Sequence, residues 1–338
     1  MSGSTSVDKG LLFKLIKNST SIAVVSDFLK KRDLPHSAGS WDDMFRLRLE
    51  PALAESKISI PDLVDLLRNV EEYGYQHIFL FHTNPAIAQS AMDRPTVTAA
   101  LASLGLSRLL TEPDLFDMPT TPAISDVRWV VDTIDTEIVI KEIQVKERYE
   151  LSNEIFSSNG MIREYKKIQD RGVNIARLKR NGDLEIRIAS RSGSNSYSSD
   201  LSNFRNRIKN ILPLSGFAEK SLSTAKDTLW NNRALYSGKI RFSEVAARND
   251  DDYILKATGG NLESNVSSNV ASVTSMESFI GMDGKCESYN LWFSKAHTPS
   301  KRDVHVLLSG EVNEFAINAH CTQSDYEYVI AELRSLNA

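Results

Sequence analysis

Cysteine is scarce in this sequence. The 338 residues include two cysteines, Cys286 and Cys321. Two thiols are too few for a disulfide framework, and neither stands at a metal-ligand spacing from another cysteine or histidine. They could pair only if the fold brought them together, so we expect buried free thiols in a reducing compartment.

Long apolar runs are also missing. No stretch approaches the roughly 18–20 apolar residues that a membrane-spanning helix needs. The segment from Met1 to Lys9 is short and polar, and no apolar run with a small-residue cleavage site follows it. We therefore expect no signal peptide and no membrane partner, and we predict a cytoplasmic protein.

The common phosphate-binding loops are absent as well. The glycines at 259–260 and at 281–284 lack the spacing of a P-loop, and no Gly-x-Gly-x-x-Gly occurs. His77 and His82 are five residues apart, which is neither the spacing of one strand face nor that of a helical zinc motif. We predict no resident cofactor and no metal site.

One segment stands out by its charge. The whole chain has a net charge of −4, which argues against a general polyanion binder. Between Arg163 and Lys209, however, twelve Lys and Arg residues face five acids, so this segment is +7 and the remainder is −11. A local basic face on an acidic body is therefore the main functional signal in the sequence.

A β-hairpin is expected at the centre of this segment. Asn181-Gly182 separates two β-rich runs, and both residues of a two-residue type I′ turn need positive φ, which Asn-Gly tolerates best. Such a turn places Arg177 and Lys179 on the face of Ile175 and places Arg180 and Arg187 on the other. The predicted cross-strand pairs are Arg180–Asp183, Lys179–Leu184, Arg177–Ile186 and Ile175–Ile188.

The hydrophobic pattern predicts an α+β protein with a small N-terminal helical bundle. Apolar residues recur at helical spacing between residues 9 and 82, and Ser21, Ser40 and Ser59 stand at helix starts. Half of the ten prolines fall between 83 and 125. We therefore predict a helical interaction module at 1–82, a proline-rich connector at 83–125 with one short helix, and a mixed α+β domain with antiparallel hairpins at 126–338.

The larger domain is expected to carry several strands and two long helices, with a further division near 213–235. Runs of β-branched and aromatic residues predict strands. Apolar residues at helical spacing predict a helix that ends at Pro213, because proline cannot continue it. The expected strands are 127–131, 138–146, 289–293, 305–308 and 315–319, and the expected helices are 198–212 and 324–336.

Nucleic-acid binding is the leading functional hypothesis. Each phosphate that a cation neutralises releases counterions, so a few such contacts give measurable affinity. The residues expected to supply them are Arg177, Lys179, Arg180, Arg187, Arg191, Arg205, Arg207 and Lys209. The competing interpretation is a half-buried hairpin whose charges are solvated.

A metal-dependent nuclease is the first alternative. Asp132 and Asp135 precede a strand on which Glu142, Gln144 and Lys146 share one side, as an acid plus Glu/Gln-x-Lys arrangement would need. Ile138 and Ile140 share that side, which weakens the pattern. Mg²⁺ would be required only under this alternative, with Asp135, Glu142, Gln144 and Lys146 as the catalytic set.

We therefore expect a non-enzymatic adaptor. Residues 1–82 would contact a protein partner, and the segment 163–209 would contact nucleic acid. The second alternative is a purely protein-binding scaffold subunit whose basic segment meets an acidic partner surface.

Overall fold

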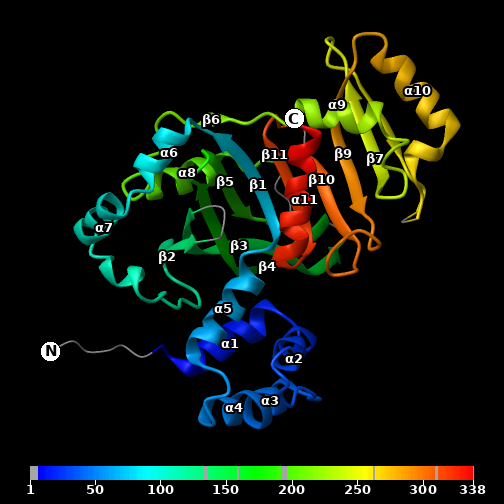
Figure 1. Ribbon diagram of the computed structural model, residues 1–338. Coiled ribbons are helices and arrows are strands. Elements are labelled where there is room, and N and C mark those ends of the chain that lie inside the picture. Colours follow the sequence, from blue (N-terminus) through cyan, green and yellow to red (C-terminus); the bar gives the residue numbers. More distant parts are fainter. Residues whose placement is uncertain are drawn as a thin grey trace. The chain divides into compact units, whose positions relative to one another are not determined.

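The computed structural model describes residues 7–131, 136–157, 160–191, 196–261, 263–308 and 311–337. These residues form a mixed α+β structure with an antiparallel sheet of eleven described strands (Figure 1). They divide into two compact units, one made of residues up to 72 with 108–126 and 142–173, the other of 73–107, 127–141 and 174 onward. The α+β class is confirmed, while the domain boundaries at 82 and 125 stay predictions.

The N-terminal part of the first unit is helical where the apolar spacing predicted helices. A core that includes Leu15, Leu29 and Leu63 joins these elements. Ser59 forms a capping box with Asp62 at the last of them, whereas Ser21 stands at an N-cap position without a side-chain cap hydrogen bond. The helices are α1 (Lys9–Ser19), α2 (Ile22–Lys30), α3 (Trp41–Met44), α4 (Glu50–Ala54) and α5 (Ile60–Glu71), with a π-helical turn at Phe45–Leu49.

The proline-rich segment holds more helix than predicted. The expected helix is α7 (Arg94–Ser103), but α6 (Pro85–Ala91) and a 3₁₀ turn at Ser107–Leu110 accompany it. Pro85 and Pro95 lie in the first turns of α6 and α7. A proline is tolerated there because the first N–H groups of a helix have no partner within it. These two prolines therefore start helices.

The strands follow each other in an order that puts an early strand at the centre of the sheet. The order is β2-β3-β4-β5-β1-β11-β10-β9-β7-β8, and β6 pairs with β1. Because β1 lies between β5 and β11, most of its residues are buried. The strands are β1 (Gly74–His82), β2 (Ala123–Val131), β3 (Thr136–Ser157), β4 (Gly160–Lys179), β5 (Asp183–Ala189), β6 (Ala218–Glu219), β7 (Ile240–Arg248), β8 (Ile254–Thr258), β9 (Lys285–Phe293), β10 (Val304–Leu308) and β11 (Glu314–His320).

Helices cover the sheet in the second unit. The α11 ribbon crosses the sheet in front of β11 and β10 (Figure 1), and α11 begins with a capping box formed by Thr322 and Asp325. The helices are α8 (Ser198–Ile208), α9 (Ser223–Asn231), α10 (Val270–Ile280) and α11 (Gln323–Leu336); α9, α10 and β7 were not predicted. Across the described ranges, no helix is long and apolar enough to cross a membrane.

Candidate functional site

The central hairpin forms where it was predicted, but its register differs from the prediction by one residue. Arg177 lies opposite Glu185 and Leu178 opposite Leu184, so the predicted pairing of Arg177 with Ile186 is wrong. Gly182 has φ of +98°, whereas Asn181 is not among the residues with positive φ. The turn is therefore not a two-residue type I′ turn. The Asn181 side chain instead accepts a hydrogen bond from the Asp183 N–H.

This register gathers the charged residues of the hairpin on one face of the sheet. Residues directly opposite each other on paired strands share a face, and residues two apart on one strand do as well. Arg177, Glu185 and Arg187 therefore lie together, while Leu178, Leu184 and Ile186 lie on the opposite face. A shift of one residue turns every side chain of one strand to the other face, which is why the predicted face of Arg187 was wrong.

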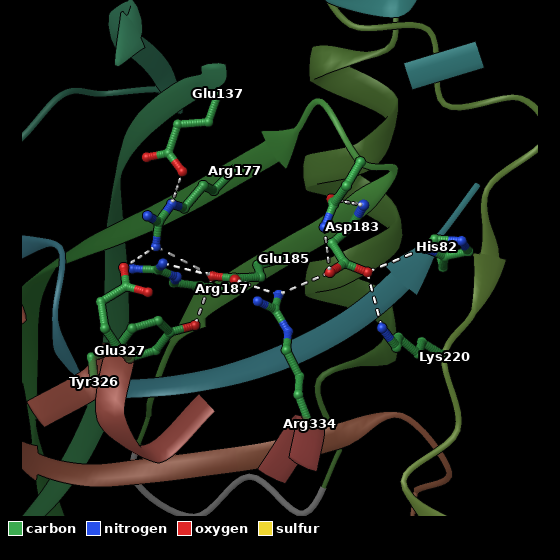
Figure 2. Close-up of polar contacts among 11 residues, drawn as sticks. His82, Glu137, Arg177, Asp183, Glu185, Arg187, Lys220, Tyr326, Glu327 and Arg334 are labelled. Carbon is green, nitrogen blue, oxygen red and sulfur yellow. Dashed lines mark hydrogen bonds and ion pairs between the residues drawn. The ribbon is translucent and has the colours of Figure 1, made fainter. Parts of the chain in front are cut away.

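A buried ion cluster occupies the charged face (Figure 2). The fully buried Glu185 accepts hydrogen bonds from Arg187 at 2.7 Å, from the Tyr326 hydroxyl at 2.9 Å and from Arg334 at 3.1 Å. Arg177 pairs with Glu137 at 2.8 Å and also with Glu327. Helix α11 thus supplies three groups to the hairpin: the Tyr326 hydroxyl, the Glu327 carboxylate and the Arg334 guanidinium.

Asp183 forms the second end of the cluster. Its carboxylate lies 2.9 Å from the Lys220 ammonium, 3.1 Å from the His82 ring and 3.6 Å from the Arg334 guanidinium. Four Lys and Arg side chains thus face four carboxylates within the described part of the cluster: Arg177, Arg187, Lys220 and Arg334 against Glu137, Asp183, Glu185 and Glu327. The cluster is balanced in charge, so these hairpin charges are neutralised inside the fold.

The cluster fixes the ionised form of its carboxylates. Burial alone would raise the pKa of Glu185, but Arg187, Arg177 and Arg334 outweigh burial and lower this pKa to about 2. Burial acts in the same way on Asp183, where Lys220, Arg334 and His82 hold the pKa below its usual value. Both groups therefore stabilise the fold as carboxylates rather than as carboxylic acids.

This arrangement predicts a loss of stability in acid. Glu185 has an ordinary pKa of 4.5 and a folded-state pKa of about 2, so its contribution is present above 4.5 and disappears as the pH falls towards 2. The difference is worth about 3 kcal/mol of unfolding free energy. Urea unfolding between pH 7 and pH 2 measures it. An unfolding free energy that does not fall between pH 5 and pH 3 would contradict the assignment.

The eight predicted nucleic-acid contacts separate into internal and external residues. Arg177 and Arg187 are buried, with 7% and 1% of their surface exposed. Arg191 is exposed and lies 3.4 Å from the Asp200 carboxylate. The remaining cations reach the surface: Arg180 and Lys209 are exposed, and Lys179, Arg205 and Arg207 are half-buried.

A groove along α8 brings two of the external cations together. Its volume is about 650 Å³. It is lined by Ser198, Leu201, Ser202, Arg205, Asn206, Lys209, Asn210, Pro213, Leu214 and Ser215. None of these ten lining residues, all within the described chain, is acidic. The groove therefore offers two positive charges together with hydroxyl and amide groups that can donate hydrogen bonds.

Backbone contacts place the hairpin turn near one end of this groove. The Thr83 N–H donates to the Gly182 carbonyl at 3.0 Å, and the Thr83 hydroxyl donates to the Gly216 carbonyl at 2.8 Å. Gly216 directly follows Ser215, which lines the groove. The exposed Arg180 precedes this turn by one residue. Sequence separation hid this link, because Thr83 is about a hundred residues from the hairpin.

The residues of the nuclease alternative are only partly described. Glu142 is fully buried, and Gln144 and Lys146 are half-buried. The Lys146 stem lies over Gly172, where an added Cβ would come within 2.9 Å of it. Asp132 and Asp135 lie outside the described residues. In the described ranges, no three His, Cys, Asp or Glu side chains gather as a metal site would need.

The two cysteines are not activated nucleophiles. Both thiols are free and partly exposed. Burial raises the pKa of Cys286 to about 11 and that of Cys321 to about 12. A thiol with such a pKa is almost entirely protonated at neutral pH, and the thiolate is the reactive form.

Comparison with known proteins gives no family. No protein-family model matches the chain, and no curated protein matches its sequence. The function proposed below therefore rests on the groove along α8 and on the charges around it.

Proposed function

We propose that this chain is a non-enzymatic adaptor that contacts the phosphate backbone of nucleic acid through the groove along α8. The observation that carries the proposal is the groove itself, which holds Arg205 and Lys209 and has no acidic lining residue. Lys179, Arg180, Arg191 and Arg207 extend the basic surface in this proposal. Arg177 and Arg187 do not contact nucleic acid in this proposal, because both are buried in the ion cluster.

The two groove cations are arranged to bind successive phosphates. Arg205 and Lys209 are four residues apart on a helix, so they project from the same side about 6 Å apart along the axis. The Arg205 guanidinium lies 4.8 Å from the centre of the Phe81 ring. A cation held over an aromatic face loses less conformational freedom when it binds an anion, which favours contact.

Backbone contact rather than base recognition is the mode that this groove favours. None of its ten described lining residues is aromatic, so it offers no platform on which a base would stack. Serine hydroxyls, asparagine amides and cations commonly contact phosphates and sugars, and such contacts carry no direct sequence information. We therefore expect binding that is tolerant of sequence and sensitive to salt.

Salt-titrated binding to single- and double-stranded DNA and RNA tests the proposal. The double variant Arg205→Ala/Lys209→Ala is expected to weaken binding about 50-fold near 0.1 M salt and to reduce the salt slope by about 2, because two phosphate contacts are lost. The matched control is Lys285→Ala/Lys295→Ala, which removes the same charge at two exposed positions outside the groove. Its effect should be several-fold smaller.

The same assay distinguishes the alternatives. Equal weakening by the groove variant and the control would show a general charge effect and would overturn the groove as the site. Fragments formed only with Mg²⁺, and lost in Glu142→Ala, would favour the metal-dependent nuclease. No binding at low salt would remove nucleic acid and leave the purely protein-binding scaffold.

The N-terminal helices carry the other half of the proposal. In it, the helices α1 to α5 within the predicted module 1–82 contact a protein partner in the cytoplasm, while β1 (Gly74–His82) belongs to the sheet. Leu47 supports it, because this side chain is 46% exposed in the π-helical turn that links α3 to α4. A Leu47→Glu variant that keeps every cross-linked partner of the unchanged chain would contradict Leu47 as the contact.

A further inference from the structure

A second cavity of the described chain lies beside helix α9. Its volume is about 320 Å³, at the small end of the roughly 300–1,000 Å³ that small-molecule sites occupy. Its described lining residues come from α9, from the end of β7 and the turn after it, from β9, and from the segment just before β11. Segments that are far apart in the sequence thus enclose one hollow that is large enough for a small metabolite.

Lys226 is the buried charged residue in the wall of this cavity. It lines the cavity, although 3% of its surface is exposed. The Tyr289 hydroxyl donates a hydrogen bond to the Lys226 backbone carbonyl at 2.7 Å. The Lys226 amine donates to the Glu311 backbone carbonyl at 3.4 Å. Both the backbone and the amine of Lys226 therefore have a defined position at the cavity wall.

The surroundings of Lys226 favour a neutral amine. Burial lowers the pKa of Lys226, because an ammonium group loses its hydration there. The acidic groups near the amine raise this pKa by less: Glu287, Glu314, Cys286 and Glu311. A neutral amine has a lone pair that can attack a carbonyl carbon, and desolvated lysines are the ones that form imines in proteins.

The neighbouring thiol does not compete with this amine. Cys286 lines the same cavity, and burial raises the pKa of its thiol to about 11. Such a thiol is almost entirely protonated at neutral pH, and the thiol form is a poor nucleophile. Lys226 is therefore the nucleophile that this cavity offers.

The other charges of the cavity fit a ligand with an anionic group. Arg248 and Lys285 are its further cations, and Asp250 and Glu287 are its described acids. Arg248 lies 2.6 Å from Glu287. A protonated imine at Lys226 keeps a positive charge, so the occupied cavity would hold three positive and two negative charges. A carboxylate on the ligand balances this excess.

We propose that this cavity binds a small 2-oxo acid, that is, a carbonyl compound with an adjacent carboxylate, as an imine on Lys226. The amine nitrogen attacks the carbonyl carbon, the carbonyl oxygen leaves as water with both amine protons, and a C=N bond remains. The imine nitrogen then takes up one proton from solvent. No electrons are gained or lost, so the step needs no oxidant, and water reverses it.

Reductive trapping of the full-length chain, without nucleic acid, tests the proposal. Glyoxylate is the probe, and sodium cyanoborohydride delivers a hydride to the imine carbon, which makes the adduct permanent. Mass spectrometry of the intact chain and of its peptides locates the adduct. We expect the first adduct on Lys226, before any on Lys295, which is exposed outside the cavity.

Two matched variants and a second probe sharpen the test. Lys226→Arg should lose the first adduct, because arginine keeps the charge but is not deprotonated, whereas Lys295→Arg should retain it. Acetaldehyde has no carboxylate, so its labelling of Lys226 relative to Lys295 should be several-fold lower than that of glyoxylate. Equal ratios for the two probes would contradict the carboxylate as part of the ligand.

Two results would overturn the imine itself. One is labelling of the unchanged chain that is spread evenly over its exposed lysines, a result that does not depend on whether any variant folds. The other is a first adduct that persists in Lys226→Arg while the melting temperature matches that of the unchanged chain. Neither involves nucleic-acid binding, so this proposal and the α8 groove stand or fall separately.

Discussion

Replacing Glu185 by glutamine is expected to lower the free energy of unfolding by about 3–5 kcal/mol. The side chain keeps its size, but the charge that balances Arg187, Arg177 and Arg334 disappears in a fully buried place. Removing one partner of a buried ion pair is costly because the remaining charge cannot return to water. Urea unfolding at pH 7, followed by circular dichroism, measures the loss.

Glu219→Gln is the matched control for this substitution. Glu219 is exposed on β6, so the same chemical change there should cost less than about 0.5 kcal/mol. A loss of under 1 kcal/mol in Glu185→Gln would show that the ion cluster contributes little to stability. Glu185→Gln should also flatten the acid dependence described above, since it removes a titrating group whose pKa is lowered to about 2.

Gly182→Ala is expected to destabilise the chain by about 3 kcal/mol or more. Gly182 has φ of +98°, a backbone angle that residues other than glycine rarely adopt. An added Cβ would also come within 2.0 Å of the Thr83 carbonyl oxygen. The clash involves backbone, so a side-chain rotation cannot relieve it. Thermal unfolding measures the change, and loss of the Thr83 contact should also disturb the nearby end of the α8 groove.

Gly105→Ala separates the two causes. Gly105 also has positive φ, +71°, but no atom lies within 4 Å of the Cβ that alanine would add. In Gly105→Ala, backbone strain is the one source of destabilisation, and it should lower the free energy of unfolding by about 1–2 kcal/mol. Equal losses in the two variants would contradict the close approach of Thr83 as the reason for glycine at 182.

Local pattern was sufficient to predict many of the elements. The helices near Leu15 and Leu63, the hairpin at Asn181-Gly182 and the closing helix that contains Tyr326 all occur where apolar spacing and turn residues indicated them. The reason is that helix periodicity, capping and turn chemistry act over a few residues. The missed elements α9, β7 and α10 have weak local signals and are stabilised by packing against the sheet.

The net charge of a sequence segment did not predict which of its charged residues are exposed. A segment of +7 suggested an exposed basic face. In the structure, Arg177 instead meets Glu137 and Glu327 from other parts of the sequence, and Arg187 pairs with Glu185 inside the fold. Net charge counts residues along the chain, whereas the surface depends on which of them the fold pairs.

The sequence by itself determined the α+β class, most helix starts and the position of the central hairpin. Only the tertiary structure decided the hairpin register, which charges are neutralised, and where a basic groove remains. A register depends on the neighbouring strand β1 and on Thr83, which lie about a hundred residues away. Contacts over such separations leave no local signal, because they arise only when distant segments pack together.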